Sequence, residues 1–213
     1  MATPAAAGWL LLKTGAMTTW IALLRAVNLG ARNKVPMPAL RAALTEAGLR
    51  DVRTYVQSGN ISFGSRHRRP AAVSRAVRDV VRREFGVDQP VIVRTQEQIE
   101  SVITGNPYSQ AAVDRPKLLH VTFMTAAPDP AGVQVVHTDP LSRDVCRVVG
   151  ADLYVDFGES VHGSRLSGQW FERRLGVEGT ARNWRTVLAL LDLAQAVPAA
   201  PVGGGTQRSE PPG

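Results

Sequence analysis

The polar segment RAVNLGARNK, from Arg25 to Lys34, contains the residue types that bind anions. Its arginines and lysine supply positive charge, Asn28 and Asn33 supply amide donors, and Gly30 lets the backbone bend around a ligand. A helix is expected directly after it, and the free N–H groups at a helix N-terminus hold anions. The segment has neither the GxxxxGK[ST] of a phosphate-binding P-loop nor the GxGxxG of a dinucleotide fold. It is therefore either an anion site or a solvated connector between two elements.

A second polar stretch, YVQSGN at residues 55–60, contains the amides Gln57 and Asn60 on either side of a Ser-Gly pair. This pair predicts a two-residue hairpin turn in which Gly59 takes a positive φ. The period of two then places Gln57 opposite Asn60, on the face of the sheet away from the helices. The two amides either close the hairpin with a cross-strand hydrogen bond or face an open groove that receives a ligand.

Two further polar stretches precede predicted helices near the end of the chain. Arg182 and Asn183 lie directly before an apolar helix in TARNWRTV, where Asn183 is a suitable N-cap. Ser164 is predicted in the same way to cap the helix that carries Leu166 and Phe171. Capping alone accounts for Asn183 and Ser164, whereas it gives Arg182 no role.

The chain has a formal net charge of +7, and only three of its basic residues are lysines. A positive net charge attracts phosphate-rich partners. A genome whose proteins are generally rich in arginine would give the same net charge without any such partner. Arg75, Arg78 and Arg82 form one stripe on a predicted helix, with Arg83 beside it. The stripe either follows a nucleic-acid phosphate backbone or is the solvated face of a helix.

Several kinds of chemistry lack the residues that they need. The four histidines and Cys146 have no metal-ligand spacing, so neither a metal nor another cofactor is expected. No serine lies in a G-x-S-x-G elbow, and no catalytic residue is identified. An RNA-recognition sheet needs stacking aromatics, but Phe63 in NISFG faces the helices. Nucleic acid is therefore a partner only without base stacking.

No apolar run approaches the roughly 20 residues that span a bilayer, so no membrane partner is expected. Near the start of the chain the first positive charge, Lys13, follows the apolar stretch, whereas a secretory signal carries its charge first. These features predict a cytoplasmic protein. Its oligomeric state is left open.

The elements that must position these residues follow from hydrophobic periodicity. Residues 17–94 have the order strand, helix, strand, strand, helix, strand, which is the ferredoxin-like βαββαβ unit. A linking helix and loop are predicted over 95–116, with Thr95 and Gln98 as a capping box. Residues 117–195 repeat the theme and end in a helix.

The second half is predicted to be degraded, because the segment from Thr125 to Pro140 has three prolines and little helical periodicity. The first helix of the unit belongs there, so this segment is expected to be mostly loop. Residues 1–16 show no periodicity, and the Pro- and Gly-rich tail over 196–213 is expected to be disordered. The predicted fold class is α+β, with two ferredoxin-like halves in one compact unit.

Two long stretches, WIALLRAVNLGARNKVPMPALRAALTEAGLRDVRTYVQSGNISFGS and GSRLSGQWFERRLGVEGTARNWRTV, closely resemble the opening and closing motifs of a bacterial family, domain of unknown function 1697. The resemblance covers Thr19 to Ala194 and implies an α+β fold with ferredoxin-like halves. The family has no established activity, so the resemblance implies signature positions but no reaction. Those positions are Arg25, Asn28, Asn33, Lys34, Gln57, Ser58, Gly59, Asn60, Ser164, Arg182, Asn183 and Trp184.

One signature stretch departs from the family. Where the family usually has Ser-Lys-Leu-Thr-Asn, this chain has Ser-Arg-Leu-Ser-Gly at residues 164–168. Arg165 therefore replaces a lysine, and a guanidinium cannot supply the amine of a Schiff base. A step that depends on that amine is not implied.

These residues, taken with the resemblance, favour a cytoplasmic binding protein with a basic, amide-rich groove for an anionic ligand, either a nucleotide or nucleic-acid phosphates. The predicted ligand-binding residues are Arg25, Asn28, Asn33, Lys34, Gln57, Asn60, Arg165, Arg182 and Asn183. One alternative is a small metal-independent enzyme that uses Lys34 or Asp156 for proton transfer. Another is a structural or assembly protein that pairs through open sheet faces.

Overall fold

The computed structural model describes residues 17–30, 33–138, 144–166 and 168–197. The predicted N-terminal extension over 1–16 lies outside the described residues, and so does the predicted tail apart from its first two positions. Arg32, in the polar loop, and Ser167, in the departing signature stretch, also lie outside them.

The first half is an antiparallel four-stranded sheet with two helices. Its elements are β1 (Thr18–Leu24), α1 (Met37–Glu46), β2 (Arg50–Tyr55), β3 (Asn60–Ser65), α2 (Pro70–Phe85) and β4 (Val91–Thr95). The strands lie in the order β2-β3-β1-β4, which confirms the predicted βαββαβ unit. β1 is buried on both faces, since Trp20 and Ala22 belong to the cluster under α1 and α2 while Ile21 packs on the opposite side.

Two helices, α3 (Gln96–Thr104) and α4 (Ser109–Asp114), connect the halves. The predicted capping box at the start of α3 is confirmed. The Thr95 hydroxyl accepts a hydrogen bond from the Gln98 N–H, and the Gln98 side chain accepts one from the Thr95 N–H. Gly105 follows the helix as its C-cap.

The second half repeats this topology. Its elements are β5 (Leu119–Met124), α5 (Pro130–Thr138), β6 (Val145–Val149), β7 (Asp152–Asp156), α6 (Gly168–Leu175) and β8 (Gly179–Asn183), followed by α7 (Trp184–Gln195). Its strands lie in the order β6-β7-β5-β8, which matches the first half strand for strand. The predicted fold class, α+β with two ferredoxin-like halves, is therefore confirmed.

Two elements of the second half differ from what periodicity indicates. Helix α5 lies in the segment that was expected to be mostly loop, so that expectation is wrong for nine of its residues. A Cβ at Gly132 of α5 would overlap the backbone of Arg174 in α6, so close packing compensates for a weak helical pattern. Strand β8 has the polar sequence GTARN, which carries no strand signal, and it forms as the edge partner of β5.

The hairpin between β2 and β3 is longer than the predicted two-residue turn. Tyr55 pairs with Asn60, so residues 56–59 form a four-residue connection and the predicted pairing of Gln57 with Asn60 is wrong. The register differs from the prediction by two residues, which preserves the face on which each side chain lies. Gly59 has the predicted positive φ, at 69°.

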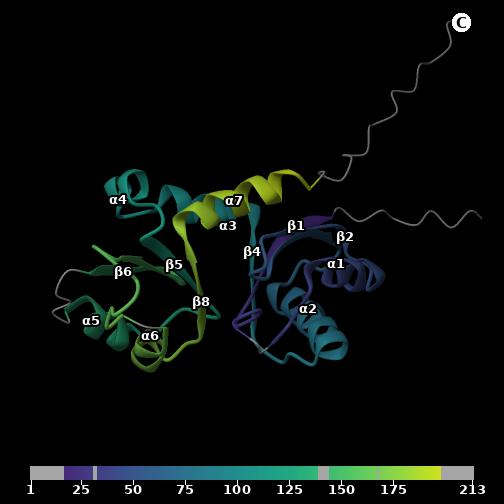
Figure 1. The fold of residues 1–213 in the computed structure, drawn as a ribbon, viewed down its shortest axis with the longest axis horizontal. Coiled ribbons are helices and arrows are strands. Elements are labelled where there is room, and N and C mark those ends of the chain that lie inside the picture. The colour runs from purple at the N-terminus through teal and green to yellow at the C-terminus, as the bar shows by residue number, and fades with distance from the viewer. Residues whose placement is uncertain (1–16, 31–32, 139–143, 167, 198–213) are drawn as a thin grey trace, which may run out of the picture.

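Three hydrophobic clusters hold the described part of the chain together. One lies between the first sheet and helices α1 and α2, one lies on the α5 and α6 side of the second sheet, and one lies between the two sheets with α3 and α7. Figure 1 shows α3 and α7 together above both sheets, with α1 and α2 below one sheet and α5 and α6 below the other. The face of the first sheet that was predicted to be open is therefore covered, since Ile21, Leu23 and Ile92 pack with Ile99 and Trp184.

Candidate functional site

A groove of about 670 Å³ lies where the two halves meet. The first half contributes the end of β1, the residues that follow it, and the hairpin. The second half contributes β5, α6, β8 and the start of α7. Three predicted site residues, Arg25, Arg182 and Asn183, line this groove together with Ser58 and Glu172.

Arg182 is the central polar residue of the groove. Arg182 is only 9% exposed, and each of its five N–H groups donates a hydrogen bond. The acceptors are Asn60 Oδ1 at 2.6 Å from Nε, Thr180 Oγ1 at 2.7 Å and Ala181 O at 2.9 Å from Nη1, and Leu24 O at 2.9 Å and Ser58 O at 3.1 Å from Nη2. One side chain of β8 therefore binds β1 and the hairpin of the other half.

The charge of Arg182 is not matched by an acid in its hydrogen-bond shell. All five acceptors are uncharged oxygens of amide, hydroxyl or backbone groups. Burial disfavours the charged form and lowers the pKa of Arg182 to about 10, which leaves it protonated at neutral pH. A buried cation with neutral partners makes the nearby groove electropositive.

Asn60 contacts the guanidinium of Arg182 and is fully buried. Its Nδ2 donates to Ser58 Oγ at 2.8 Å and to Tyr55 O at 3.3 Å, while its Oδ1 faces the guanidinium. The amide therefore closes the hairpin and orients Arg182. Gln57, by contrast, has an exposed side chain and takes part through its backbone oxygen, which accepts from Asn28 Nδ2 at 2.8 Å.

The amides of the polar loop hold the loop in shape. Asn28 bridges to Val35 in both directions, since Nδ2 donates to Val35 O and Oδ1 accepts from Val35 N–H. Asn33 donates from Nδ2 to Ala26 O at 2.9 Å. Both asparagines have positive φ, which short polar side chains tolerate better than most. Lys34 is exposed and does not line the groove.

Arg25 spans the groove as part of an ion-pair triad. Nη2 donates to both carboxylate oxygens of Glu172, at 2.8 and 2.9 Å, and Nη1 donates to Glu178 at 2.8 Å. Arg25 follows β1, whereas both glutamates belong to the second half, so the triad is a second polar link between the halves. The two glutamates more than balance the positive charge of Arg25, whereas no acid is bonded to Arg182.

The remaining predicted positions have local roles. Asn183 is the N-cap of α7, and its side chain accepts from the Thr186 N–H at 3.0 Å. Ser164 was expected to cap α6, but α6 begins at Gly168, and the Ser164 hydroxyl instead donates to Asp144 and accepts from Leu166 N–H. Arg165 is exposed before α6 and lies outside the groove lining.

The sequence pattern of the family described as Protein of unknown function (DUF1697) matches residues 17–154. The chain belongs to this family. It is also similar to a solved structure, the conserved bacterial protein SP0830 from Streptococcus pneumoniae, with a TM-score of 0.67 and 24% sequence identity. That match covers 84% of this chain and 99% of the other, and at such identity it shows a shared fold alone. No curated protein matches the chain.

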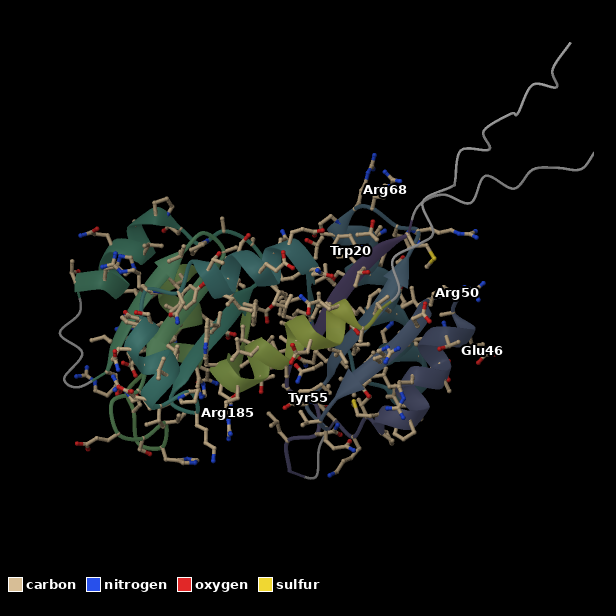
Figure 2. The ribbon with its side chains drawn as sticks, turned by 90° about the horizontal axis from the view of Figure 1, so that it is seen from above. Trp20, Glu46, Arg50, Tyr55, Arg68 and Arg185 are labelled. Carbon is tan, nitrogen blue, oxygen red and sulfur yellow. The ribbon has the colours of Figure 1, made fainter. Side chains whose placement is uncertain are left out.

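A second groove of this DUF1697 protein, of about 770 Å³, follows the predicted arginine stripe. Arg75, Arg78 and Arg82 of α2 line one wall, and β4 lines the other. Arg78 pairs with Asp88 at 2.6 Å and Arg82 with Asp79 at 3.6 Å, and all these side chains are well exposed. Just before α2, Arg68 projects from the surface (Figure 2). The stripe is thus a solvated helix face that also borders a groove.

The candidates for proton transfer in this DUF1697 protein do not form a pair. Asp156 is buried, and both of its oxygens are held by Arg115, at 2.9 Å from Nε and 2.6 Å from Nη2. Lys34 is exposed on the loop after β1. Among the described residues no three His, Cys, Asp or Glu side chains gather as a metal site. No helix in the described part of the chain is long and apolar enough to cross a membrane.

Several groove residues carry no signal in the sequence of this DUF1697 protein. Glu172 lies on an ordinary amphipathic helix, and its pairing with Arg25 spans 147 positions. Thr180 and Ala181 lie on β8, whose polar sequence does not indicate a strand. His120 has no neighbouring ligand residues in the sequence, yet it lines the groove from β5.

Proposed function

We propose that this DUF1697 protein binds a small anionic ligand in the groove between its halves. The observation that carries the proposal is Arg182, a buried guanidinium whose five hydrogen bonds all end on uncharged oxygens. Charges in a poorly hydrated site interact strongly, so an anion in this groove gains more than it gains at an exposed arginine. Because the guanidinium is already held by five bonds, it attracts the anion through its charge and not by direct donation.

The size of the groove supports a ligand as large as a nucleotide. Sites for small molecules and cofactors usually enclose about 300–1,000 Å³, and this groove encloses about 670 Å³. Its charged lining residues are two arginines, Arg25 and Arg182, and one acid, Glu172. Glu178, the other acid bonded to Arg25, is half exposed and lies outside the lining, so the lining itself favours an anion over a neutral or cationic ligand.

The proposal divides the sequence-predicted residues into two groups. Arg25, Arg182 and Asn183 belong to the lining, and Asn60 supports Arg182 from below. The other five hold the neighbouring loops or lie on the surface nearby, and the proposal gives them no direct contact with the ligand. These are Asn28, Asn33, Lys34, Gln57 and Arg165.

Replacing Asn60 with Asp tests the proposal with little change of shape. The new carboxylate would lie where Asn60 Oδ1 now lies, 2.6 Å from Arg182 Nε, and would neutralise the guanidinium. The Ser58 hydroxyl can reverse its role and donate to the new oxygen, so the hairpin keeps a bond. Gln57→Glu is the matched control, because it makes the same chemical change on an exposed side chain of the same turn.

Binding of inorganic pyrophosphate and of a nucleoside monophosphate is measured by titration calorimetry. We expect wild type and Gln57→Glu to bind alike and Asn60→Asp to bind at least tenfold more weakly, which is about 1.4 kcal/mol. Thermal unfolding establishes that each variant is folded. A folded Asn60→Asp that binds both anions as tightly as wild type would exclude Arg182 as the source of the attraction, and so would a wild type that binds neither.

The second groove favours a second candidate function, which is contact with nucleic-acid phosphates. Arg75, Arg78 and Arg82 lie along successive turns of α2, and the exposed ion pairs of Arg78 and Arg82 are weak enough to exchange for phosphates. Base stacking is not part of this candidate, since Phe63 is fully buried. Binding of single-stranded DNA that weakens steeply with salt, and that disappears when the three arginines become alanine, would support it. Binding that the triple variant retains would argue against it.

A further inference from the structure

An apolar cavity of about 280 Å³ lies inside the second half, between the outer face of its sheet and α6. Its walls include Met124, Leu153, Val155, Phe157 and Phe171. Protein interiors are normally packed without voids of this size. A cavity of about 150 Å³ with apolar walls is enough to bind benzene. This cavity therefore has room for a ring with a short substituent.

The cavity opens into the groove between the halves. His120, Gly168, Glu172, Gly179 and Ala181 line both spaces, so they form a shared mouth. Three of these five have no side chain beyond Cβ, which leaves the passage unobstructed. At Gly179 the close approach is required, since a Cβ there would lie 2.6 Å from Thr122 Cγ2.

The polar groups at the mouth do not repel an acidic head group strongly. His120 packs edge-to-face on Phe157, with ring centroids 5.2 Å apart, and its Nε2 lies 3.1 Å from Lys117 O. Burial lowers the pKa of His120, so the imidazole is neutral at pH 7. Glu172 is engaged by both N–H groups of one Arg25 nitrogen. Glu178, the second acid bonded to Arg25, is half exposed to solvent, which screens its charge. The buried guanidinium of Arg182 adjoins the mouth through its hydrogen bond to Ala181 O, and no acid is bonded to it.

We infer that the ligand of this protein is an amphipathic anion, with a compact apolar body in the cavity and a carboxylate or phosphate head in the groove. The inference rests on the proposed function and narrows it to one class of ligand. A body the size of a phenyl ring or a short acyl chain suits the cavity. An inorganic anion occupies only the groove, and a neutral apolar molecule occupies only the cavity. Each should therefore bind more weakly than a ligand that occupies both.

Three probes separate the two spaces. They are 3-phenylpropionate, its neutral analogue 3-phenylpropan-1-ol, and inorganic pyrophosphate. We expect wild type to bind 3-phenylpropionate at least tenfold more tightly than the alcohol in titration calorimetry. Asn60→Asp is expected to abolish this difference, because it neutralises Arg182, and to leave binding of the alcohol unchanged.

Two variants fill the cavity without touching the groove. Leu153→Phe adds bulk from β7, and Val161→Trp adds it from the loop before α6, where Val161 is 37% exposed and tolerates change. Both residues line the cavity, and neither lines the groove. Each variant should weaken 3-phenylpropionate and the alcohol at least tenfold and leave pyrophosphate binding unchanged.

The outcomes distinguish this inference from the proposed function. If pyrophosphate binds but 3-phenylpropionate has no advantage over the alcohol, or binds both cavity variants as it binds wild type, the inference is wrong and the anion groove stands. If neither anion binds wild type, both fail. Thermal unfolding of each variant shows that it is folded, and if one is not, the other supplies the result.

Discussion

Replacing Arg182 with methionine should be among the most destabilising single changes on the surface between the halves. Methionine has a similar length and packs in apolar surroundings, but it has no donor for the acceptors that the guanidinium now satisfies. Leu24 O and Asn60 Oδ1 are both buried and would lose this bond. The variant therefore isolates the polar link from the loss of volume.

The magnitude follows from two opposing terms. Hydrogen bonds from a charged donor contribute roughly 1.5 kcal/mol or more each, so the five together contribute about 7–8 kcal/mol. Burial acts in the other direction, since lowering the pKa of Arg182 from 12.5 to about 10 corresponds to roughly 3 kcal/mol that an apolar side chain recovers. The net loss of unfolding free energy is about 4–5 kcal/mol, which agrees with the usual effect of removing one member of a buried polar network.

The assay is urea unfolding followed by circular dichroism, with Arg25→Met as the matched control. Arg25 also joins the halves, but its side chain is 25% exposed and Glu178 is more exposed still. Its loss should cost at most about 1 kcal/mol. Arg182→Lys keeps the charge and up to three donors, so it should fall between the two.

A result in which Arg182→Met and Arg25→Met lower the unfolding free energy equally would refute this reasoning. It would mean that water or a rearranged hairpin satisfies the five acceptors without the guanidinium. A loss below about 1 kcal/mol for Arg182→Met would have the same meaning, because the five bonds would then contribute no more than an exposed ion pair.

Three further predictions concern local parts of the structure. Gly59→Ala should lower the free energy of unfolding by more than about 2 kcal/mol, because it combines a positive φ with a Cβ that lies 2.6 Å from Leu24 Cβ. Gly150→Ala is its control in urea unfolding. Gly150 has a positive φ but open space around it, so its substitution should cost about 1 kcal/mol. Asn183→Ala should lose about 1 kcal/mol of stability through its cap, and no loss would mean that α7 does not need it. Burial lowers the pKa of His120 below 6.5, so the unfolded chain takes up a proton first and stability falls as the pH drops below that value. His120→Gln should therefore show a flatter stability profile between pH 7 and pH 5, and an unchanged profile would assign that slope to other groups.

The first half could be predicted from its sequence because each of its elements is marked locally. The apolar run of β1 indicates a strand that is covered on both faces, and the residue burial agrees. The valines of α2 recur at helical spacing and form its buried face. The capping box of Thr95 and Gln98 predicts where α3 begins, and the helix does begin at the next residue, Gln96. Local signals of this kind do not depend on distant parts of the chain.

The errors arose where tertiary contacts determine the local structure. Helix α5 is maintained by its packing against α6, which its own sequence does not encode. The hairpin is longer than a Ser-Gly pair suggests because Val56 also takes a positive φ, which a β-branched residue rarely does. Leu24 N–H donates to Gly59 O at 2.9 Å, so β1 helps to hold the turn in this form.

Three of the nine predicted ligand-binding residues line the groove, and the sequence did not indicate how they are arranged. Arg182, which was predicted to bind a ligand, bonds to the end of β1 and to the hairpin, and no sequence pattern indicates these bonds. An asparagine side chain looks the same in sequence whether it binds a ligand, caps a helix or orients an arginine. Only the positions of its partners distinguish these roles, and those partners lie as many as 122 residues away.

The two halves share an apolar cluster, and apolar contact alone does not fix how two surfaces are rotated against each other, because it has no direction. Arg182 supplies that direction. Its five acceptors come from the end of β1, from the hairpin and from β8, so a shift of one half leaves buried oxygens without donors. The same side chain carries the charge that makes the groove attractive to an anion. Orientation of the halves and binding in the groove are therefore thermodynamically linked, and an anion that occupies the groove should stabilise the folded chain in proportion to its concentration relative to its dissociation constant.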